Sequence, residues 1–126
     1  MKKLIGLVFT LMFLTLAFAD QNVTINFALK SGGQTAACGE PLMLGSTQAS
    51  TQLLDARLFI SEVEVLTEDG AFPLELEQDG VWQYENLALI DFENATGACQ
   101  GTPDTHTQIS GDITAQGAIT GIRFNI

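Results

Sequence analysis

The residues best suited to chemistry in this 126-residue chain are one histidine and two cysteines. His106 lies between two threonines, and Cys38 and Cys99 each lie within two residues of a glycine. A single imidazole is more often a surface or satisfied residue than a ligand, and a Cys–His catalytic pair requires a free thiol. The sequence has no G-x-S-x-G, H-E-x-x-H or C-x-x-C motif and no glycine-rich phosphate loop. We therefore identify no catalytic or cofactor-binding residue and expect a protein that is not an enzyme.

Metal ligands are also scarce. Copper(I) prefers His, Met and Cys side chains, and here His106, Met43 and the cysteines are too few to define a site. Asp91, Glu93 and Asn94 offer oxygen atoms for calcium, but their spacing does not match the EF-hand pattern. No metal ligand is assigned from these residues.

The two cysteines allow two interpretations. They either form a disulfide with each other or pair with cysteines that this chain does not contain, and sequence alone does not set connectivity. A Cys38–Cys99 bridge would close a loop of about 60 residues, which contributes a few kcal/mol in the chain-entropy estimate.

The N-terminus has the pattern of a secretory signal peptide. Met1-Lys2-Lys3 is basic, Leu4–Phe18 is apolar, and Ala17-Phe18-Ala19 is a cleavage site of the A-x-A type. The alternative, a transmembrane anchor, needs about 20 apolar residues. We predict a signal peptide at residues 1–19, cleavage before Asp20 and no membrane span after its removal. The product is expected to be periplasmic or secreted.

The charge balance excludes one class of partner. The chain has a formal net charge of −10, and cleavage would leave Lys30, Arg57 and Arg123 against 15 acidic residues. Nucleic-acid binding needs clustered Lys and Arg to displace counterions, so no nucleic-acid partner is expected, and anionic membrane surfaces are disfavoured too. The charge is compatible with cation binding, although solubility explains it more simply.

The strongest structural pattern is the segment Leu58–Glu93. Short β-branched and aromatic runs are separated by Asp69-Gly70 and Asp79-Gly80, which predicts an antiparallel meander with tight turns. Within it, apolar and acidic residues alternate at 62–65 and 74–77, giving each strand one buried face. Trp82 is interpreted as a core aromatic of this meander.

The flanking segments also favour strands. Alternation at 23–30 and 121–126, a short apolar run at 42–44 and a Thr/Ile/Ser mixture at 105–112 all predict strands, while 45–52 is expected to be a loop. Residues 53–57 fit either a helical turn or an extended lead into the next strand. No helical period is sustained outside residues 1–19. We predict an all-β, antiparallel β-sandwich over residues 20–126, incomplete at the C-terminus because the chain stops inside a strand pattern.

An ordered set of phrases resembles a known family. These are Ile25–Ala28, Ala37–Gly39, Arg57–Val63, Gln78–Tyr84, Ala88–Glu93, Gly97–Cys99, Gly101–Pro103 and Gly121–Phe124. In this order they are similar to the N-terminal half of the MbnP-like copper-binding proteins, also described as metallo-mystery-pair four-Cys proteins. The resemblance covers essentially all of residues 20–126.

The resemblance implies an exported protein of copper homeostasis that works with a di-haem peroxidase similar to MauG. In that family the peroxidase oxidises a tryptophan in a W-x-W motif to kynurenine, and the product takes part in the copper site. Cys38 and Cys99 would match the first two of the four family cysteines. The only tryptophan here, Trp82, stands in Val-Trp-Gln-Tyr, so most of the family's metal site is expected outside this chain. A non-catalytic exported β-sandwich interaction module is the alternative.

Overall fold

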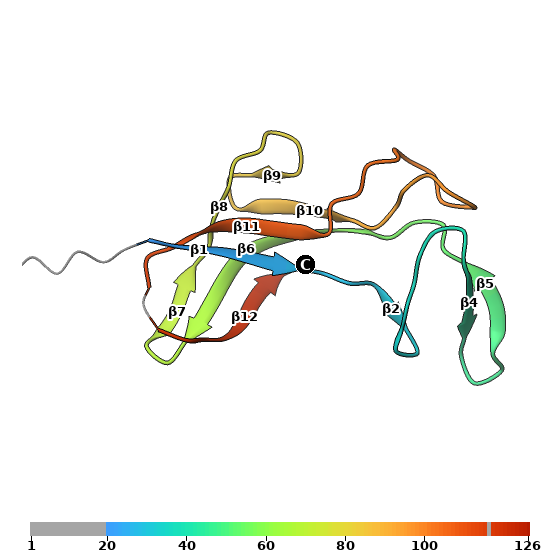
Figure 1. Ribbon diagram of the computed structural model, residues 1–126, viewed down its shortest axis with the longest axis horizontal. Coiled ribbons are helices and arrows are strands. Elements are labelled where there is room, and N and C mark those ends of the chain that lie inside the picture. Colours follow the sequence, from blue (N-terminus) through green and yellow to red (C-terminus); the bar gives the residue numbers. More distant parts are fainter. Residues whose placement is uncertain (1–19, 116) are drawn as a thin grey trace, which may run out of the picture.

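The computed structural model describes residues 20–115 and 117–126, and the predicted signal peptide at 1–19 lies outside them. All regular secondary structure in the described part of the chain is β-strand, and every strand pairing is antiparallel (Figure 1). Across these residues no helix is long and apolar enough to cross a bilayer. The all-β prediction is confirmed.

Two main sheets make up the body of the molecule. The first has the order β1-β11-β8, formed by Gln21–Asn26, Gln108–Ile113 and Glu75–Leu76. The second has the order β12-β6-β10-β9, with β7 also paired to β6. Its strands are β12 (Ile119–Asn125), β6 (Arg57–Thr67), β10 (Leu87–Asp91), β9 (Gln83–Tyr84) and β7 (Gly70–Pro73).

Strand β6 changes neighbour at Glu62. Its residues 57–61 pair with β10, whereas residues 64–67 pair with β7. Glu62 itself has a positive φ of 50°, an uncommon conformation for a residue other than glycine. Directly after it, Val63 accepts a 2.8 Å hydrogen bond from the Leu74 N–H, where the chain leaves β7 and enters β8 of the other sheet. The two sheets are therefore joined at this corner.

The core lies between the two sheets. Its most buried side chains are 0–1% exposed and come from both: Ile60 and Val65 of β6, Ile90 of β10, and Ile109 and Ile113 of β11. The alternation predicted for the meander is confirmed, because Val63, Val65, Leu74 and Leu76 are all buried. One shared core with strands of both sheets around it is the arrangement of a β-sandwich.

The prediction of an antiparallel meander over residues 58–93 is only partly confirmed. Asp69-Gly70 closes the β6–β7 hairpin as predicted. The second Asp-Gly does not close a hairpin, because β8 pairs with β11 rather than with β9. The strand predicted at β8 is correct, but β8 pairs with a strand about 35 residues away in sequence. A turn signal such as Asp-Gly specifies only neighbouring strands, so it could not identify this partner.

A second correction concerns residues 45–52. The segment predicted as a loop contains β5 (Ala49–Gln52), which forms a hairpin with β4 (Pro41–Leu44). Together with the short hairpin of β2 (Lys30–Ser31) and β3 (Gln34–Thr35), it forms an arm beside the body (Figure 1). Residues 53–56 contain no helical turn, so the extended alternative for this stretch is correct.

Replacing Ile60 by Ala tests the shared core. The side chain is 0% exposed, and truncating a fully buried Ile generally costs about 2–5 kcal/mol of unfolding free energy. Urea denaturation followed by Trp82 fluorescence measures the loss. Ile122→Ala is the matched control, since Ile122 is 40% exposed on β12. Equal losses in the two variants would contradict the assignment of the core.

Candidate functional site

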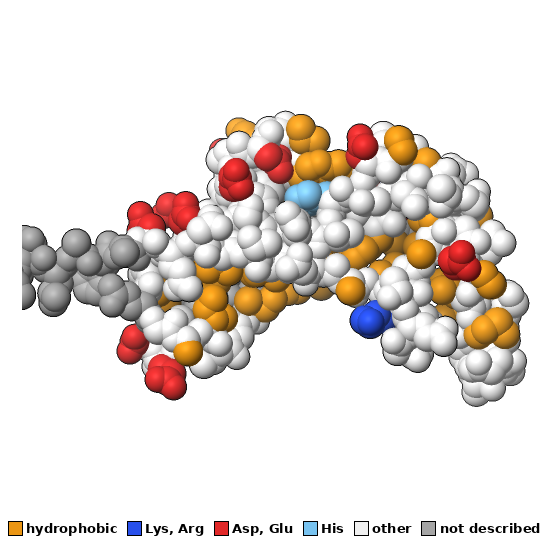
Figure 2. All heavy atoms as spheres, viewed as in Figure 1, with side chains coloured by type: hydrophobic (Ala, Val, Ile, Leu, Met, Phe, Trp, Pro, Cys, Tyr) orange, Lys and Arg blue, Asp and Glu red, His pale blue; other side chains and the backbone are white. Residues whose placement is uncertain are grey.

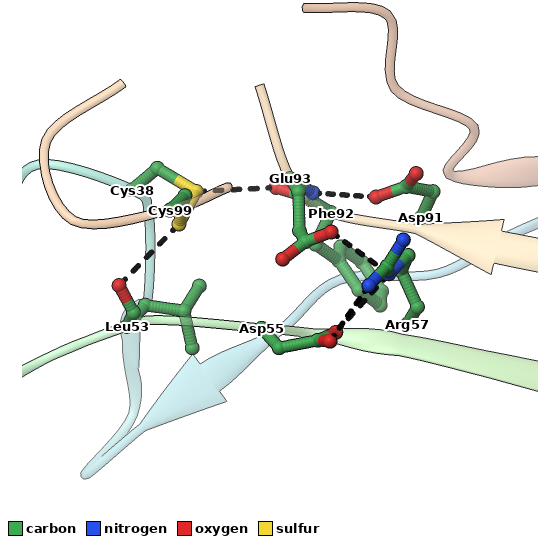
Figure 3. Close-up of polar contacts among 8 residues, drawn as sticks. All are labelled: Cys38, Leu53, Asp55, Arg57, Asp91, Phe92, Glu93 and Cys99. Atoms are coloured by element: carbon green, nitrogen blue, oxygen red, sulfur yellow. Dashed lines mark hydrogen bonds and ion pairs between the residues drawn. A yellow bond between two sulfur atoms is a disulfide. The ribbon is translucent and has the colours of Figure 1, made fainter. Parts of the chain in front are cut away.

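A cluster of charged side chains lies where β6 begins and β10 ends. Arg57, the first residue of β6, is in register with Asp91, the last residue of β10. The Arg57 guanidinium donates from Nη2 to Asp55 Oδ2 at 2.7 Å and from Nε to Asp55 Oδ1 at 3.2 Å. Nε also lies 2.8 Å from Glu93 Oε2 (Figure 3). Three carboxylates therefore lie around or beside one guanidinium.

Glu93 is the unusual member of this cluster. Its side chain is only 1% exposed, and neither carboxylate oxygen accepts a hydrogen bond. The nearby Nε–H of Arg57 is directed at Asp55, so the contact with Glu93 is an ion pair without a directed hydrogen bond. The Glu93 carboxylate is thus buried, and the Arg57 guanidinium is the cation that compensates its charge.

A pocket of about 330 Å³ opens beside this carboxylate. Its walls are Leu54, Asp55, Arg57, Glu93, Gln100 and Gly101. The hydrogen bond from Arg57 lowers the pKa of Asp55 below its ordinary value, and the same contact raises the pKa of Arg57. Both groups therefore stay charged near neutral pH. The Asp55–Arg57 pair is largely exposed, and such surface pairs contribute at most about 1 kcal/mol.

The Cys38–Cys99 disulfide is present, which resolves the alternatives for the two cysteines. It joins the loop before β4 to the loop after β10, with a Cα–Cα distance of 5.7 Å. A Cys99 sulfur contacts the Leu53 carbonyl oxygen at 3.4 Å (Figure 3). The two loops touch through glycines, because a Cβ on Gly97 would lie 2.4 Å from the Gly39 Cα. The disulfide thus fastens the arm to the body next to Glu93.

His106 and Trp82 form a stacked pair beside this cluster, because the backbones of His106 and Asp91 exchange two hydrogen bonds. Their rings are 5.3 Å apart and inclined by 3°. Nδ1 of His106 lies 2.7 Å from the Leu89 carbonyl oxygen, which can only accept, so Nδ1 is the donor in this contact. The interpretation of Trp82 as a core residue is wrong: its side chain is only partly buried, against the histidine.

The loop that carries Trp82 is held by side-chain hydrogen bonds. Asp79 Oδ1 accepts from the backbone N–H groups of Val81, Trp82 and Gln83 at 2.7–3.0 Å. Partial burial alone would raise the pKa of Asp79, but these three donors lower it below its ordinary value. The buried Gln83 side chain bonds to the backbone of Ser110 and Glu77. This network, rather than a hairpin, explains the second Asp-Gly.

The residues weighed for metal binding do not come together. Over residues 20–115 and 117–126, no three His, Cys, Asp or Glu side chains are placed to hold an ion. The cysteine sulfurs are joined to each other, and Met43 lies half-exposed on the arm. Asn94 uses its side-chain oxygen on Thr96. The described residues therefore do not fit a copper site.

Two contacts of the candidate residues could not be predicted from the sequence: the ion pair of Arg57 with Glu93 and the stacking of His106 on Trp82. Asp91 and Glu93 were considered together because they are neighbours in sequence, but the basic partner Arg57 is brought in only by the β6–β10 register. An Arg at the start of one strand pattern and paired acids at the end of another were the available signal. The His106–Trp82 stack left no local signal, because the two residues are 24 positions apart.

Comparisons with known proteins give one consistent result. The model of one protein family, MbnP, matches residues 20–126. Among solved structures, MbnP from Methylosinus trichosporium matches with 35% sequence identity and a TM-score of 0.70. The match covers 84% of this chain and 38% of that one, so this chain spans well under half the length of its relative. A search of curated proteins found no match.

Removing the disulfide tests its structural role. The bridge spans 61 residues, for which the chain-entropy estimate is about 4 kcal/mol. We expect the Cys38→Ser/Cys99→Ser double variant to lose roughly that amount of unfolding free energy in urea denaturation. Adding a reductant should affect the parent protein but not the double variant. A parent protein that is indifferent to reductant would contradict the prediction.

Replacing Asp79 tests the loop network. Asp79→Ala removes the shared acceptor and should cost about 1 kcal/mol, as for other capping residues. Asp79→Asn keeps an acceptor oxygen and should cost less. Because the folded-state pKa is lowered, the stabilisation from the charged form is present above the ordinary value of 3.8 and is lost as the pH falls through the folded pKa. Urea denaturation of the parent and of Asp79→Asn at neutral pH and at about pH 3 should therefore show a smaller difference under acid conditions.

Proposed function

This chain belongs to the MbnP family, and from that membership we propose that it is part of an exported copper-binding protein of copper homeostasis. The observation that carries the proposal is the family match over residues 20–126. The Cys38–Cys99 disulfide is consistent with export, because such bonds persist in oxidising compartments. A signal peptide at residues 1–19 would direct the chain there.

The domain and partner assignments are part of the same proposal. Residues 20–126 form the N-terminal portion of an MbnP-like copper-binding domain, and the protein is not an enzyme itself. Its partner is a di-haem peroxidase similar to MauG, which would act on the family's W-x-W tryptophan. Trp82 lacks that motif and is stacked on His106, so we do not assign it as the substrate of the peroxidase.

Copper, in this proposal, is held mainly by groups other than those described above. Two observations support this view: the disulfide removes both thiols as ligands, and the one imidazole has no second metal-ligating side chain arranged with it among the described residues. His106 is nevertheless the best single donor, since its Nδ1 is hydrogen-bonded to a backbone carbonyl, which would leave Nε2 as the ligating atom.

A copper(I) titration of residues 20–126 tests whether copper is held mainly by groups other than the described residues. In competition with a chromophoric Cu(I) chelator, we expect no tight one-to-one binding, because one nitrogen donor does not satisfy Cu(I). The His106→Ala variant should behave like the parent. Tight stoichiometric binding that disappears in His106→Ala would mean that this chain contains the copper site, and it would contradict the proposal that other groups hold the metal.

A second candidate function is a non-catalytic interaction module. The observation in its favour is the loop held by Asp79 and Gln83, which exposes Val81 and Tyr84 (75% and 66% exposed, respectively). Exposed tyrosine on a well-held segment is frequent at protein interfaces. A gene for a di-haem peroxidase beside this one would favour the copper function, whereas adhesion or cell-wall genes would favour the module.

A further inference from the structure

The second main sheet carries apolar side chains on the side that points away from the core. On β10, Ala88 and Ile90 are 0% exposed and belong to the core. Because side chains alternate along a strand, Leu87 and Leu89 point to the outer side. Phe59 of β6 is in register with Leu89 and is 58% exposed. These two side chains therefore lie next to each other on the outer side of the sheet.

Aromatic side chains on the other edge of β10 extend this surface. Tyr84 of β9 is in register with Leu87 and is 66% exposed. Asp91 has the same strand parity as Leu87, and His106 pairs with Asp91. The ring of Trp82 stacks on that of His106. We call the resulting surface the outer patch, and its residues are Phe59, Trp82, Tyr84, Leu87, Leu89 and His106.

Acidic side chains border the outer patch. Asp79 and Glu85 are exposed at the two ends of segment 80–84. Asp104 is exposed two residues before His106. Figure 2 shows hydrophobic side chains beside the histidine, over β9 and β10, with acidic side chains on both sides of them. Since carboxylates are ionised near neutral pH, the border of the patch is negative.

The basic residues of the described chain do not offset this charge. Arg57 and Arg123 each already pair with a carboxylate, that of Asp55 and that of Glu64, respectively. Lys30 belongs to β2 on the arm. A partner with basic groups around its contact surface would gain from the negative border, whereas an anionic membrane would be repelled.

The polar side chains beside the outer patch favour a protein partner over a sugar. The amide groups of Gln78 and Gln83 are already hydrogen-bonded to the backbone of this chain. A small-molecule site needs polar groups placed to bond the ligand. The centre of a protein interface, by contrast, is apolar and aromatic, and its charged groups lie at the rim. The outer patch has this second arrangement.

We propose that the outer patch docks a protein whose contact surface has an apolar centre and a basic rim. The apolar centre covers Phe59, Tyr84 and Leu87, and the basic rim meets the acidic border. Asp79 already holds the loop that carries Trp82, so docking orders few additional groups. The proposal rests on the second candidate function, the interaction module, and gives it a surface. It does not depend on copper binding, which has its own titration.

Calorimetric titration of residues 20–126 with a helical peptide of leucine and lysine tests the proposal. This peptide has one apolar face bordered by lysines. Two control peptides each keep one of these properties: one has glutamate in place of lysine, and the other has glutamine in place of leucine. We expect only the leucine–lysine peptide to bind, with an affinity that falls as the salt concentration rises. Equal binding of the glutamine–lysine peptide would mean unspecific attraction to an acidic chain and would overturn the proposal, as would no binding of the leucine–lysine peptide.

Variants locate the docking surface. Phe59→Ser removes a large apolar side chain from the outer patch and should weaken binding of the leucine–lysine peptide by about tenfold. Leu44→Ser is the matched control, because Leu44 is 46% exposed on the arm. Equal weakening in these two variants would contradict docking at the outer patch. Tyr84→Ser changes a different strand and keeps the test decisive if Phe59→Ser does not fold. Unchanged affinity in Tyr84→Ser would overturn the proposal.

Two further measurements examine other occupants of the outer patch. We expect residues 20–126 to be monomeric in sedimentation equilibrium. A dimer that dissociates in Phe59→Ser would mean that a second copy covers the patch, which would overturn the proposal. We also expect any longer form of the protein to bind the leucine–lysine peptide equally well. Loss of binding there would mean that the rest of the same chain covers the patch, and it would contradict docking of a separate protein.

Discussion

The pairing of β6 with three other strands is the constraint on which the described fold depends. The strand is eleven residues long and pairs with β12 along one edge and with β10 and then β7 along the other. The positive φ of Glu62 marks the point where the second edge changes partner, and the chain crosses to the other sheet at Leu74. Because Ile60, Val63 and Val65 on this strand are buried in the shared core, the same residues fix the register and join the layers.

The first residue of β6 also determines the candidate site. Its pairing with β10 brings Arg57 next to Asp91 and within 2.8 Å of Glu93, while the Cys38–Cys99 disulfide holds the adjacent loops in place. Acidic side chains elsewhere are scattered over the visible face of the molecule rather than gathered (Figure 2). Glu93 differs from them because it is buried, and a buried carboxylate needs the compensating charge that Arg57 supplies.

Family membership and local chemistry support different statements about this protein. The match to MbnP shows the family, from which the proposed copper function is drawn, whereas the described residues offer one imidazole and no free thiol.

The sequence by itself determined the all-β class and, in the strands of the predicted meander, which face is buried. Val63, Val65, Leu74 and Leu76 are buried as their alternation predicts, since a two-residue period follows directly from strand geometry. It also contained the phrases that identify the family. Only the tertiary structure decided that β8 pairs with β11, that Trp82 stacks on His106 instead of entering the core, and that Arg57 reaches Glu93. Each of these contacts joins residues more than 20 positions apart, and local propensity does not specify such pairs because they depend on how the whole core packs.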